Sequence, residues 1–319
     1  MAKAKSVSKQ DKAREELGAR ALARPAPLTR GAGGAPPDPL SAMSLKSIAT
    51  RVGIPVVIAW VIALLIPGWI AKAVVGVLTV VVVGIVLWAL RFATKSRKVA
   101  QIIQGTPDTP EGRKAALETL DKDFKKDDAA AIFAKAQLQL QEDPRTALKT
   151  LEGINLAKVM APIADEARTQ RAMIHLMLGE TEDARGLVDK VDMTRHKEPR
   201  TRATMAAVVG EAWARTGQPK KAVELLGTFD VDDELYKELK PQLLRARAFA
   251  YAWSSDTKQM RATLRRMSAI NPQLLMGFIT KKKNPMGVNP KGVHPALEKE
   301  AYEMVMRSGV VPRKVEFRR

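Results

Sequence analysis

The residues that most often perform chemistry in proteins are scarce in this sequence. The 319 residues include no cysteine and only three histidines, His175, His196 and His294. Without cysteine the chain has no disulfide, no thiolate nucleophile and no cysteine-based zinc or iron–sulfur site. The histidines are also too far apart in the sequence for the short spacings of a histidine-built metal site. These counts argue against most metal and nucleophilic chemistry.

No established catalytic motif is present either. The sequence contains no P-loop and no GxSxG turn of the kind found in serine hydrolases. The segment from Asp121 begins like a calcium loop, but Lys126 and Ile132 stand where that loop needs glycine and glutamate. The acidic residues around Asp230 suit a helix N-terminus, where carboxylates stabilise the helix dipole. We therefore expect no enzymatic activity, no cofactor and no metal site.

The longest elements that the sequence predicts are two apolar helices. Between Val52 and Leu90 the only charged residue is Lys72, and this stretch is about twice the ~20 residues that one membrane span needs. Pro67 and Gly68 interrupt it with a dipeptide that is typical of turns. The pattern predicts a transmembrane hairpin in which residues 49–92 contact the membrane.

Basic residues beside this hairpin predict its orientation. The lysines and arginines that follow the second helix have no acidic residue among them, as is typical of cytoplasmic loops. We expect two spans in a bacterial inner membrane, with both termini in the cytoplasm and anionic lipid near the basic flanks. The candidates for contact with lipid or phosphate groups are Arg91, Lys95, Arg97, Lys98, Lys281, Lys282 and Lys283.

The net charge of +19 is concentrated at the two ends of the chain, and residues 105–280 are nearly balanced. A uniformly basic face would indicate nucleic acid, whereas basic ends around an apolar segment fit membrane topology more simply. Aromatic residues make up only 5% of the chain, which leaves little material for stacking on bases. A nucleic-acid partner is therefore an alternative that the pattern does not favour.

The region after the hairpin has helical periodicity and an internal repeat. Four segments align, and their last residues recur every 37 or 38 positions as Ala147, Ala184, Ala222 and Met260. A bulky residue stands nine positions earlier in each segment, and an aliphatic residue stands four positions later. Such spacing across a short turn predicts pairs of antiparallel helices, which bury their apolar faces by stacking on neighbouring pairs. The aliphatic residues are Leu151, Val188, Leu226 and Leu264.

These positions resemble the tetratricopeptide repeat. Ala172, Gly210 and Ala248 match its small residue on the first helix, and Gly179 and Gly217 match its turn glycine. The observed period is longer than the usual 34 residues, so an armadillo- or HEAT-type solenoid is the main alternative. The resemblance implies an all-α chain, in which a two-helix transmembrane hairpin precedes an α-solenoid of tetratricopeptide-like helical hairpins.

The resemblance also implies where a partner would bind. In this family the first helix of each pair lines the concave face, which suits an extended peptide or a helix from another protein. Carried over position by position, the candidates for this partner groove are Thr169, Met173, Thr204, Glu211, Gln242, Arg245 and Phe249.

These features predict a division into five regions. Residues 1–45 form a disordered basic tail, residues 46–93 the hairpin, and residues 94–126 a juxtamembrane helix with a first half-repeat. Residues 127–280 form the helical repeat domain, and residues 281–319 a basic loop, a short capping helix and a tail. We expect the second apolar helix to continue to about residue 104, where residues 110–126 pair with it or cap the repeats.

Taken together, the sequence predicts a binding protein. The first hypothesis is a membrane-anchored scaffold or assembly factor whose solenoid recruits proteins at the cytoplasmic face. Its order of elements is similar to that of repeat-bearing inner-membrane proteins of bacterial haem-biosynthesis operons. The alternatives are a non-catalytic subunit of a larger membrane machine and a tether that binds nucleic acid or ribosomes through the basic ends.

Overall fold

A computed structural model of the chain describes residues 54, 56–61, 65, 69–107, 109–279 and 292–309. Within these residues every regular element is a helix and no strand is present, so the expected all-α class is confirmed. The chain divides into two compact units, one formed by residues 34–139 and the other by residues 140–319 together with residues 1–33. This division falls inside the first predicted helical pair.

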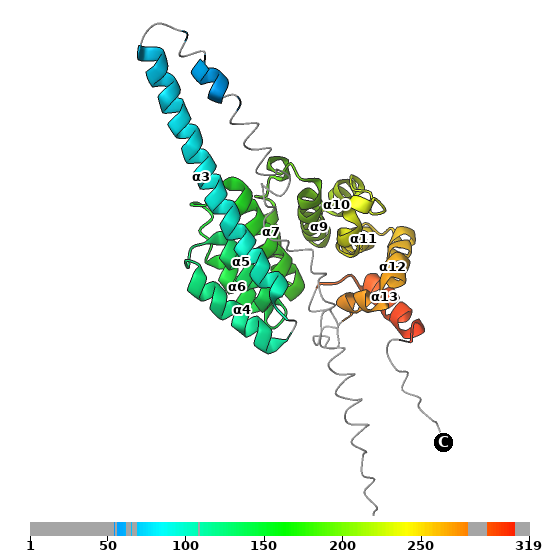
Figure 1. Cartoon of the computed structure of the whole chain (residues 1–319). Coiled ribbons are helices and arrows are strands. Elements are labelled where there is room, and N and C mark those ends of the chain that lie inside the picture. The colour runs from blue at the N-terminus through cyan, green and yellow to red at the C-terminus, as the bar shows by residue number, and fades with distance from the viewer. Residues whose placement is uncertain are drawn as a thin grey trace, which may run out of the picture. The chain divides into compact units, whose positions relative to one another are not determined.

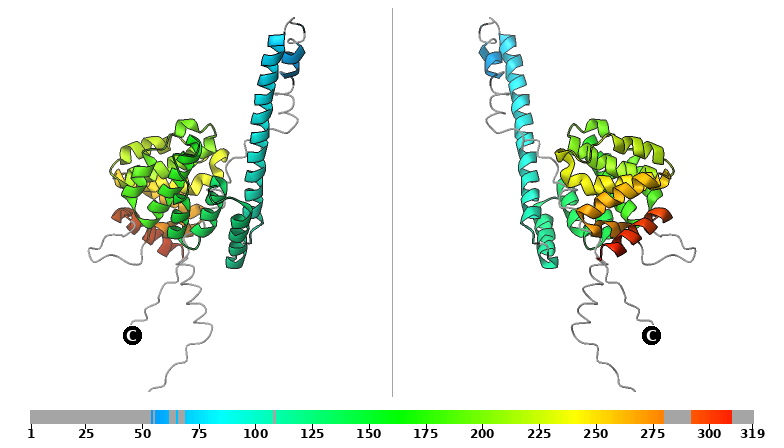
Figure 2. Two further views of the ribbon diagram at one scale, coloured as in Figure 1. Left: turned by 90° about the vertical axis from the view of Figure 1, so that its left-hand side faces the viewer. Right: turned by 90° about the vertical axis from the view of Figure 1, so that its right-hand side faces the viewer.

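The unit of residues 34–139 contains α3 (Trp69–Gly105), α4 (Pro110–Asp123) and α5 (Ala129–Leu140). The second predicted apolar helix does continue beyond the apolar stretch, and Figure 2 shows α3 as one long helix. Thr109 caps α4 by accepting a hydrogen bond from the Gly112 N–H at 3.1 Å. Side chains from all three helices share one core, which explains why α4 pairs with α3 as expected. Its buried members are Val99, Ala116, Leu120, Ala130, Ala134 and Leu138.

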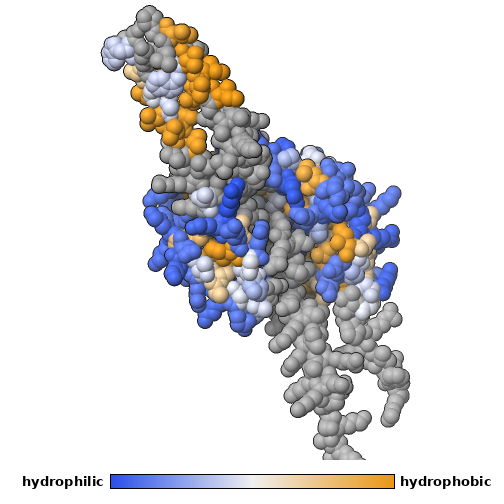
Figure 3. All heavy atoms as spheres, viewed as in Figure 1, coloured by the Kyte–Doolittle hydropathy of each residue, from blue (hydrophilic) through white to orange (hydrophobic). Residues whose placement is uncertain are grey.

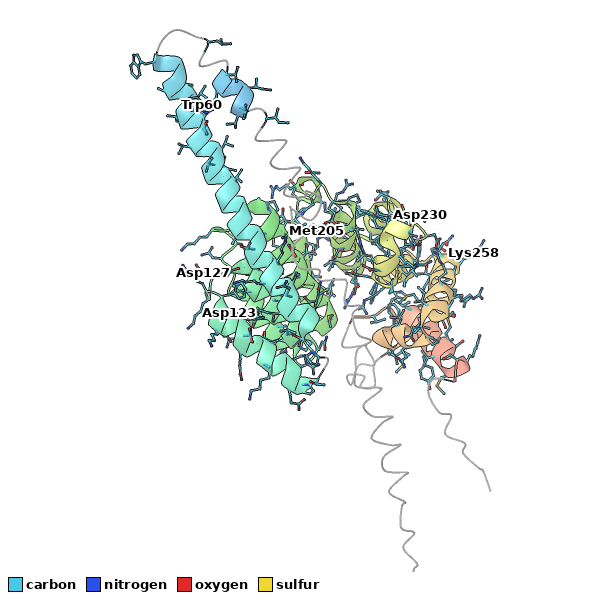
Figure 4. All side chains as sticks on the ribbon, viewed as in Figure 1. Trp60, Asp123, Asp127, Met205, Asp230 and Lys258 are labelled. Carbon is cyan, nitrogen blue, oxygen red and sulfur yellow. The ribbon has the colours of Figure 1, made fainter. Side chains whose placement is uncertain are left out.

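The N-terminal half of α3 carries an exposed apolar surface. Val77, Val80 and Ile85 are among its large apolar side chains that are exposed, and Figure 3 shows an orange, hydrophobic surface along the described part of this helix. The indole N–H of Trp60 donates to the Thr79 hydroxyl of α3 at 3.1 Å, so a residue of the first apolar stretch contacts the second (Figure 4). Among the described residues no helix is both long enough and apolar enough to cross a membrane, and the expected two-span hairpin is not supported there.

The second unit is a series of helical pairs. The first elements are α6 (Pro144–Glu152), α7 (Ala161–Leu178), α8 (Thr181–Val188), α9 (Pro199–Arg215) and α10 (Pro219–Gly227). They are followed by α11 (Lys240–Trp253), α12 (Thr257–Ile270) and α13 (Pro295–Arg307), with short 3-10 helices η1 (Met193–Arg195), η2 (Glu234–Leu239) and η3 (Pro272–Phe278) between them. The pairs α7–α8, α9–α10 and α11–α12 follow one another in space (Figure 1). Each of these pairs corresponds to one repeat predicted from the sequence.

The turns within these three pairs share one geometry. Gly179 and Gly217 have positive φ angles of 89° and 86°, which glycine adopts without steric cost. Ser255 takes the equivalent position in the third pair at φ 63°. In each turn the next N–H donates back to a carbonyl in the last turn of the first helix, which satisfies a helix end. These bonds run from Glu180 to His175 (2.9 Å), from Gln218 to Trp213 (2.8 Å) and from Asp256 to Tyr251 (2.9 Å).

Small residues let the two helices of a pair approach closely. The residues at the predicted small and aliphatic positions of the second helices are buried, from Ala147 to Leu264. At Gly210 of α9 an added Cβ would lie 2.9 Å from two atoms of the Leu226 side chain. Real Cβ atoms do not come this close, so Leu226 occupies the space that a side chain at Gly210 would need.

The C-terminal elements pack on the last pair. Asn271 caps η3 through a hydrogen bond from the Gln273 N–H at 2.9 Å, and the His294 ring accepts from the Ala296 N–H at 3.2 Å to begin α13. Leu275, Phe278, Val293 and Leu297 join the same buried core as residues of α9 and α11. The expected capping helix is present, and α13 lies beside the last pair (Figure 2).

Several predictions lie outside the described residues. The tail of residues 1–45, most of the first apolar stretch, Lys281, Lys282, Lys283 and the last ten residues are among them. Arg91 and Lys95 fall within α3, but their side chains are not among those described. Arg97 and Lys98 are described, and both are exposed.

Candidate functional site

A buried ion cluster lies between α9 and α11. Glu211 of α9 accepts two hydrogen bonds from Arg245 of α11, with Nε 3.0 Å from Oε2 and Nη2 3.1 Å from Oε1. Arg215, one turn after Glu211, donates to Glu211 Oε1 at 2.8 Å and to the Leu176 carbonyl at 3.0 Å. The bidentate geometry is the strongest arrangement that an arginine and a carboxylate can form. Glu211 therefore links two first helices of neighbouring pairs and, through Arg215, the end of a third.

Two aromatic rings cover this cluster. The Arg215 guanidinium lies 4.8 Å from the centre of the Phe249 ring, and the Arg245 guanidinium lies 5.3 Å from it. Arg245 is also 5.7 Å from the ring of Phe278, which meets Phe249 edge to face at 5.3 Å. A cation is attracted to the face of an aromatic ring, most strongly where water is excluded. The rings thus stabilise the two cations that share the Glu211 carboxylate.

The charges in this cluster shift one another's pKa values. Burial opposes ionisation of Glu211, but the adjacent Arg245 and Arg215 outweigh it and hold the pKa of Glu211 below its usual range. At Arg215 burial lowers the pKa, whereas at Arg245 the charge of Glu211 outweighs burial and raises the pKa. All three groups are therefore charged at neutral pH, and their summed charge is positive.

The structure brings three of the seven predicted groove residues together in the cluster on α9 and α11. These are Glu211, Arg245 and Phe249. Gln242 is half-buried, and its amide oxygen has no hydrogen-bond partner within the described part of the chain. The other three, Thr169, Met173 and Thr204, lie on α7 and α9 and take no part in the cluster.

Three of these residues are buried. Phe249 is completely buried, because Phe278 and two arginines cover it. Thr169 is buried with its hydroxyl donating to the Asp165 carbonyl at 2.8 Å, and Glu211 is buried by its ion pairs. Met173, Thr204, Gln242 and Arg245 keep partial exposure. The face of α9 and α11 that the family resemblance pointed to is therefore closed by the chain itself.

Sequence reasoning missed two members of the cluster. Arg215 stands four residues after Glu211, so the spacing of an ion pair on one helix face could have identified it. Phe278 lies beyond the last repeat, in a segment without a recognisable pattern, and only the fold brings it to Phe249. Sequence reasoning also missed a repeated contact in which an arginine side chain holds the end of the preceding helix. Arg171 donates to the Leu151 and Ile154 carbonyls at 2.6 and 2.8 Å, and Arg247 donates to the Leu226 and Phe229 carbonyls at 2.8 and 2.6 Å.

A second buried carboxylate lies on α7. Asp165 is fully buried and accepts from Arg168 at 2.8 Å and from Arg195 at 3.1 Å. The ring nitrogen Nε2 of His196 is 4.0 Å away, and burial lowers the pKa of that ring. Asp165 therefore fixes the linker that contains η1 against α7. The arrangement is a structural anchor between two pairs.

One group of side chains has the composition of a metal site. The potential ligand atoms of His175, Glu180 and Asp183 lie within 4.8 Å of one another in the described part of the chain. His175 Nδ1 is 2.8 Å from Glu180 Oε2, and the other oxygen of Glu180 accepts from Arg145 at 3.0 Å. An arginine on the carboxylate disfavours a second cation there. The contacts fit a turn that is held by its own hydrogen bonds.

Known proteins do not place the chain in a family. No protein-family model, no curated protein and no solved structure matches it.

Proposed function

We propose that the chain is a protein-binding scaffold or assembly factor, and that its helical pairs form a tetratricopeptide-like α-solenoid. The observation that carries this proposal is the threefold recurrence of one helical pair with the same turn. Gly179, Gly217 and Ser255 each take a backbone conformation with positive φ in the turn of their own pair. A stacked repeat of this kind exposes an extended surface, which proteins use to bind other proteins.

The chemistry of the site supports binding more than catalysis. Glu211, Arg215 and Arg245 form a charged cluster without a nucleophile or a group that titrates near neutral pH. Arginine and aromatic side chains are the residue types that contribute most to protein interfaces. The partly exposed guanidinium of Arg245 therefore suits a partner segment that brings its own polar groups.

We further propose that residues 49–92 hold this scaffold at a bacterial inner membrane, with both termini in the cytoplasm. The support is the long sequence stretch whose only charge is Lys72, together with exposed apolar side chains such as Val77 and Val80 on α3. Burial of such a surface in lipid is favourable by about 25 cal/mol per Å².

The absence of cysteine gives a direct test of this placement. Single cysteines introduced by Gly68→Cys and by Ser308→Cys would each be the only thiol in its variant. In intact bacterial cells an impermeant maleimide should label the first variant from outside and not the second. Equal labelling of both only after lysis, with the protein in the soluble fraction, would contradict membrane insertion.

The scaffold proposal is tested by purification of the tagged chain from native membranes in mild detergent. The purification is done with nuclease, at about 0.1 M and about 0.5 M salt, which shortens the screening length by roughly half. A stoichiometric protein that is retained at both salt concentrations is the expected result. Loss of every partner at high salt or with nuclease would contradict a scaffold and would favour a nucleic-acid tether on the basic ends.

A further inference from the structure

The helix α3 extends well beyond its apolar stretch. Its 37 residues cover about 55 Å, whereas the hydrocarbon layer of a bilayer is about 30 Å thick. Exposed apolar side chains line its first half as far as Ile85, and the stretch whose only charge is Lys72 ends at Leu90. Arg97 and Lys98, beyond this point, are exposed. The last part of α3 therefore lies outside the hydrocarbon of the proposed membrane.

No residue that commonly bends a helix interrupts this last part of α3. Between Gly84 and Gly105 the helix contains neither glycine nor proline, and Figure 2 shows it as one continuous rod. The N–H of Thr106 donates to the Ile103 carbonyl at 3.3 Å and so closes the end of the helix. Elements that pack on the end of α3 are therefore held at a fixed height above the hydrocarbon.

The helix α4 runs back along α3 toward the apolar half. Residues 106–109 reverse the chain, and Val99 of α3 then shares a buried core with Ala116 and Leu120 of α4 (Figure 2). The 14 residues of α4 cover about 21 Å. The same distance, counted back along α3 from Gly105, leads to about residue 91. The C-terminal end of α4 is therefore level with the end of the apolar stretch.

The turn between α4 and α5 thus lies at the height of the lipid headgroups of the proposed membrane. We call residues 121–128 the α4–α5 turn. Phe124 is half-buried against the core of the three helices, so it fixes the turn to them. Lys122, Lys125 and Lys126 are exposed. Lysine side chains at this height place their ammonium groups among the lipid phosphates, which accept charge-assisted hydrogen bonds.

The acidic residues of the α4–α5 turn do not cancel these lysines. Asp121 pairs with Lys135 of α5. Asp128 accepts a backbone N–H at 3.2 Å at the start of α5, where the helix dipole balances part of its charge. Asp123 and Asp127 are exposed, and Figure 4 shows both in the turn. Because lysine side chains are longer than aspartate side chains, the three ammonium groups reach farther toward the phosphates than the two carboxylates do.

We propose that the α4–α5 turn rests on the anionic lipid headgroups of the membrane that α3 enters, and that Lys122, Lys125 and Lys126 bind the lipid phosphates. This inference rests on the membrane placement proposed above and adds a second contact to it, made outside the apolar stretch. The labelling of the Gly68→Cys variant tests insertion alone, so the two proposals can fail separately.

The first experiment measures the height of the turn with a single fluorophore, because the chain has no other thiol. Asp127→Cys and Glu111→Cys each replace an exposed acidic residue, and Glu111 lies about 18 Å farther along α4 from the turn. Each labelled full-length protein is reconstituted in vesicles of phosphatidylcholine and phosphatidylglycerol with a short-range quencher on the headgroups. The label at residue 127 should be quenched several-fold more than the label at residue 111.

Equal quenching at the two positions, in a chain whose Gly68→Cys variant is labelled from outside the cell, would overturn the contact and leave the membrane placement standing. Absence of labelling at Gly68→Cys would overturn both proposals.

An insertion into α3 tests whether this helix sets the height. Seven alanines between Ala93 and Thr94 add about two helical turns, which keeps the same helix face and raises the α4–α5 turn by about 10 Å. Quenching at residue 127 should then fall to the value found at residue 111. Circular dichroism establishes that the longer helix is folded. Quenching that the insertion leaves unchanged would overturn the proposal, because α3 would not place the turn.

The assignment to anionic lipid is tested by removing the lysines from the labelled Asp127→Cys protein. Lys122→Gln, Lys125→Gln and Lys126→Gln together should reduce the quenching several-fold, as should about 0.5 M salt or vesicles of phosphatidylcholine alone. The matched control removes three exposed lysines of the second unit, through Lys149→Gln, Lys190→Gln and Lys220→Gln. An equal loss in both triple variants, or no loss in either, would overturn the binding of lipid phosphates by the turn.

Discussion

At the scale of single residues, Glu211 determines how the α9–α11 face is held. Its carboxylate is the shared partner of Arg215 and Arg245 in a site from which water is largely excluded. A buried ion pair contributes little compared with apolar packing, but removing one partner leaves an uncompensated charge behind. Here removal of the carboxylate would leave two such charges. The cluster is therefore much more sensitive to loss of Glu211 than to loss of any surface charge.

The substitution Glu211→Gln should destabilise the fold by about 2–4 kcal/mol, because the buried Arg215 and the half-buried Arg245 lose the charge of Glu211 while the side-chain volume is kept. Urea unfolding, followed by circular dichroism, measures the effect. The matched control is Glu234→Gln, since Glu234 pairs with Lys237 in an exposed position and its substitution should change stability by less than about 0.5 kcal/mol. Equal effects of the two substitutions would contradict the role assigned to Glu211.

Glu166 predicts a pH dependence of stability. Burial raises its pKa to about 7, with a weaker opposing effect of a hydrogen bond from Gln170. Between the ordinary glutamate pKa and about 7 the folded state holds a proton that the unfolded state has lost. Its contribution to stability therefore decreases as the pH rises through this window. The opposite holds for Glu211, whose lowered pKa makes its contribution disappear in acid.

The substitution Glu166→Gln should consequently stabilise the protein by about 1–3 kcal/mol at about pH 8 and have little effect at about pH 5. The free energy of unfolding at the two pH values, for wild type and variant, measures this difference. A stabilisation of equal size at both pH values would mean that the proton on Glu166 is not its source.

At the scale of elements, close approach within a helical pair explains the small residues of the repeat. Gly210 faces Leu226 without room for a Cβ, whereas an added Cβ on Gly186 of α8 would meet no atom within 4 Å. Helix propensity alone favours alanine over glycine at both positions by about 1 kcal/mol. Packing and propensity thus act in opposite directions at Gly210 and in the same direction at Gly186.

We therefore expect Gly210→Ala to destabilise the protein by about 1–3 kcal/mol and Gly186→Ala to stabilise it by about 0.5–1 kcal/mol. Chemical denaturation of both variants and the wild type measures the change in the free energy of unfolding. Because both substitutions are glycine to alanine, any difference between them comes from their surroundings. If both variants were stabilised, the contact between Gly210 and Leu226 would not limit the approach of α9 and α10.

The features of these elements that could be predicted from the sequence are those that depend on single residues and their near neighbours. The caps at Thr109 and the turns at Gly179 and Gly217 follow from the backbone preferences of single residues, and all lie where the pattern predicts them. Ser255 takes the same conformation against its preference, so only the alignment of the repeat could indicate it. Contacts that depend on distant segments, such as Phe278 on Phe249, leave no local signal. The groove candidates all lie on the first helices of their pairs, and three of the seven are buried.

At the scale of the whole molecule, each of the two units has its own hydrophobic core. The helices α3 to α5 share buried residues such as Leu120, and the helical pairs share another core around Leu243. The sequence predicted the continuation of α3 beyond its apolar half, because the helical periodicity does not break there. It did not predict that the compact units divide at residues 139 and 140, since that position looks like the inside of a repeat.

The central proposal is that the helical pairs capture a protein partner, and that the partly exposed Arg245 of α11 contributes to the contact. The most direct measurement compares partner recovery by tagged wild type, Arg245→Ala and Arg265→Ala, purified side by side at about 0.5 M salt. Arg265 is an exposed arginine on α12, so its variant removes the same charge away from the face. We predict that Arg245→Ala, shown to be folded by circular dichroism, loses most of the partner while Arg265→Ala retains it. Full recovery by the folded Arg245→Ala variant would contradict the claim.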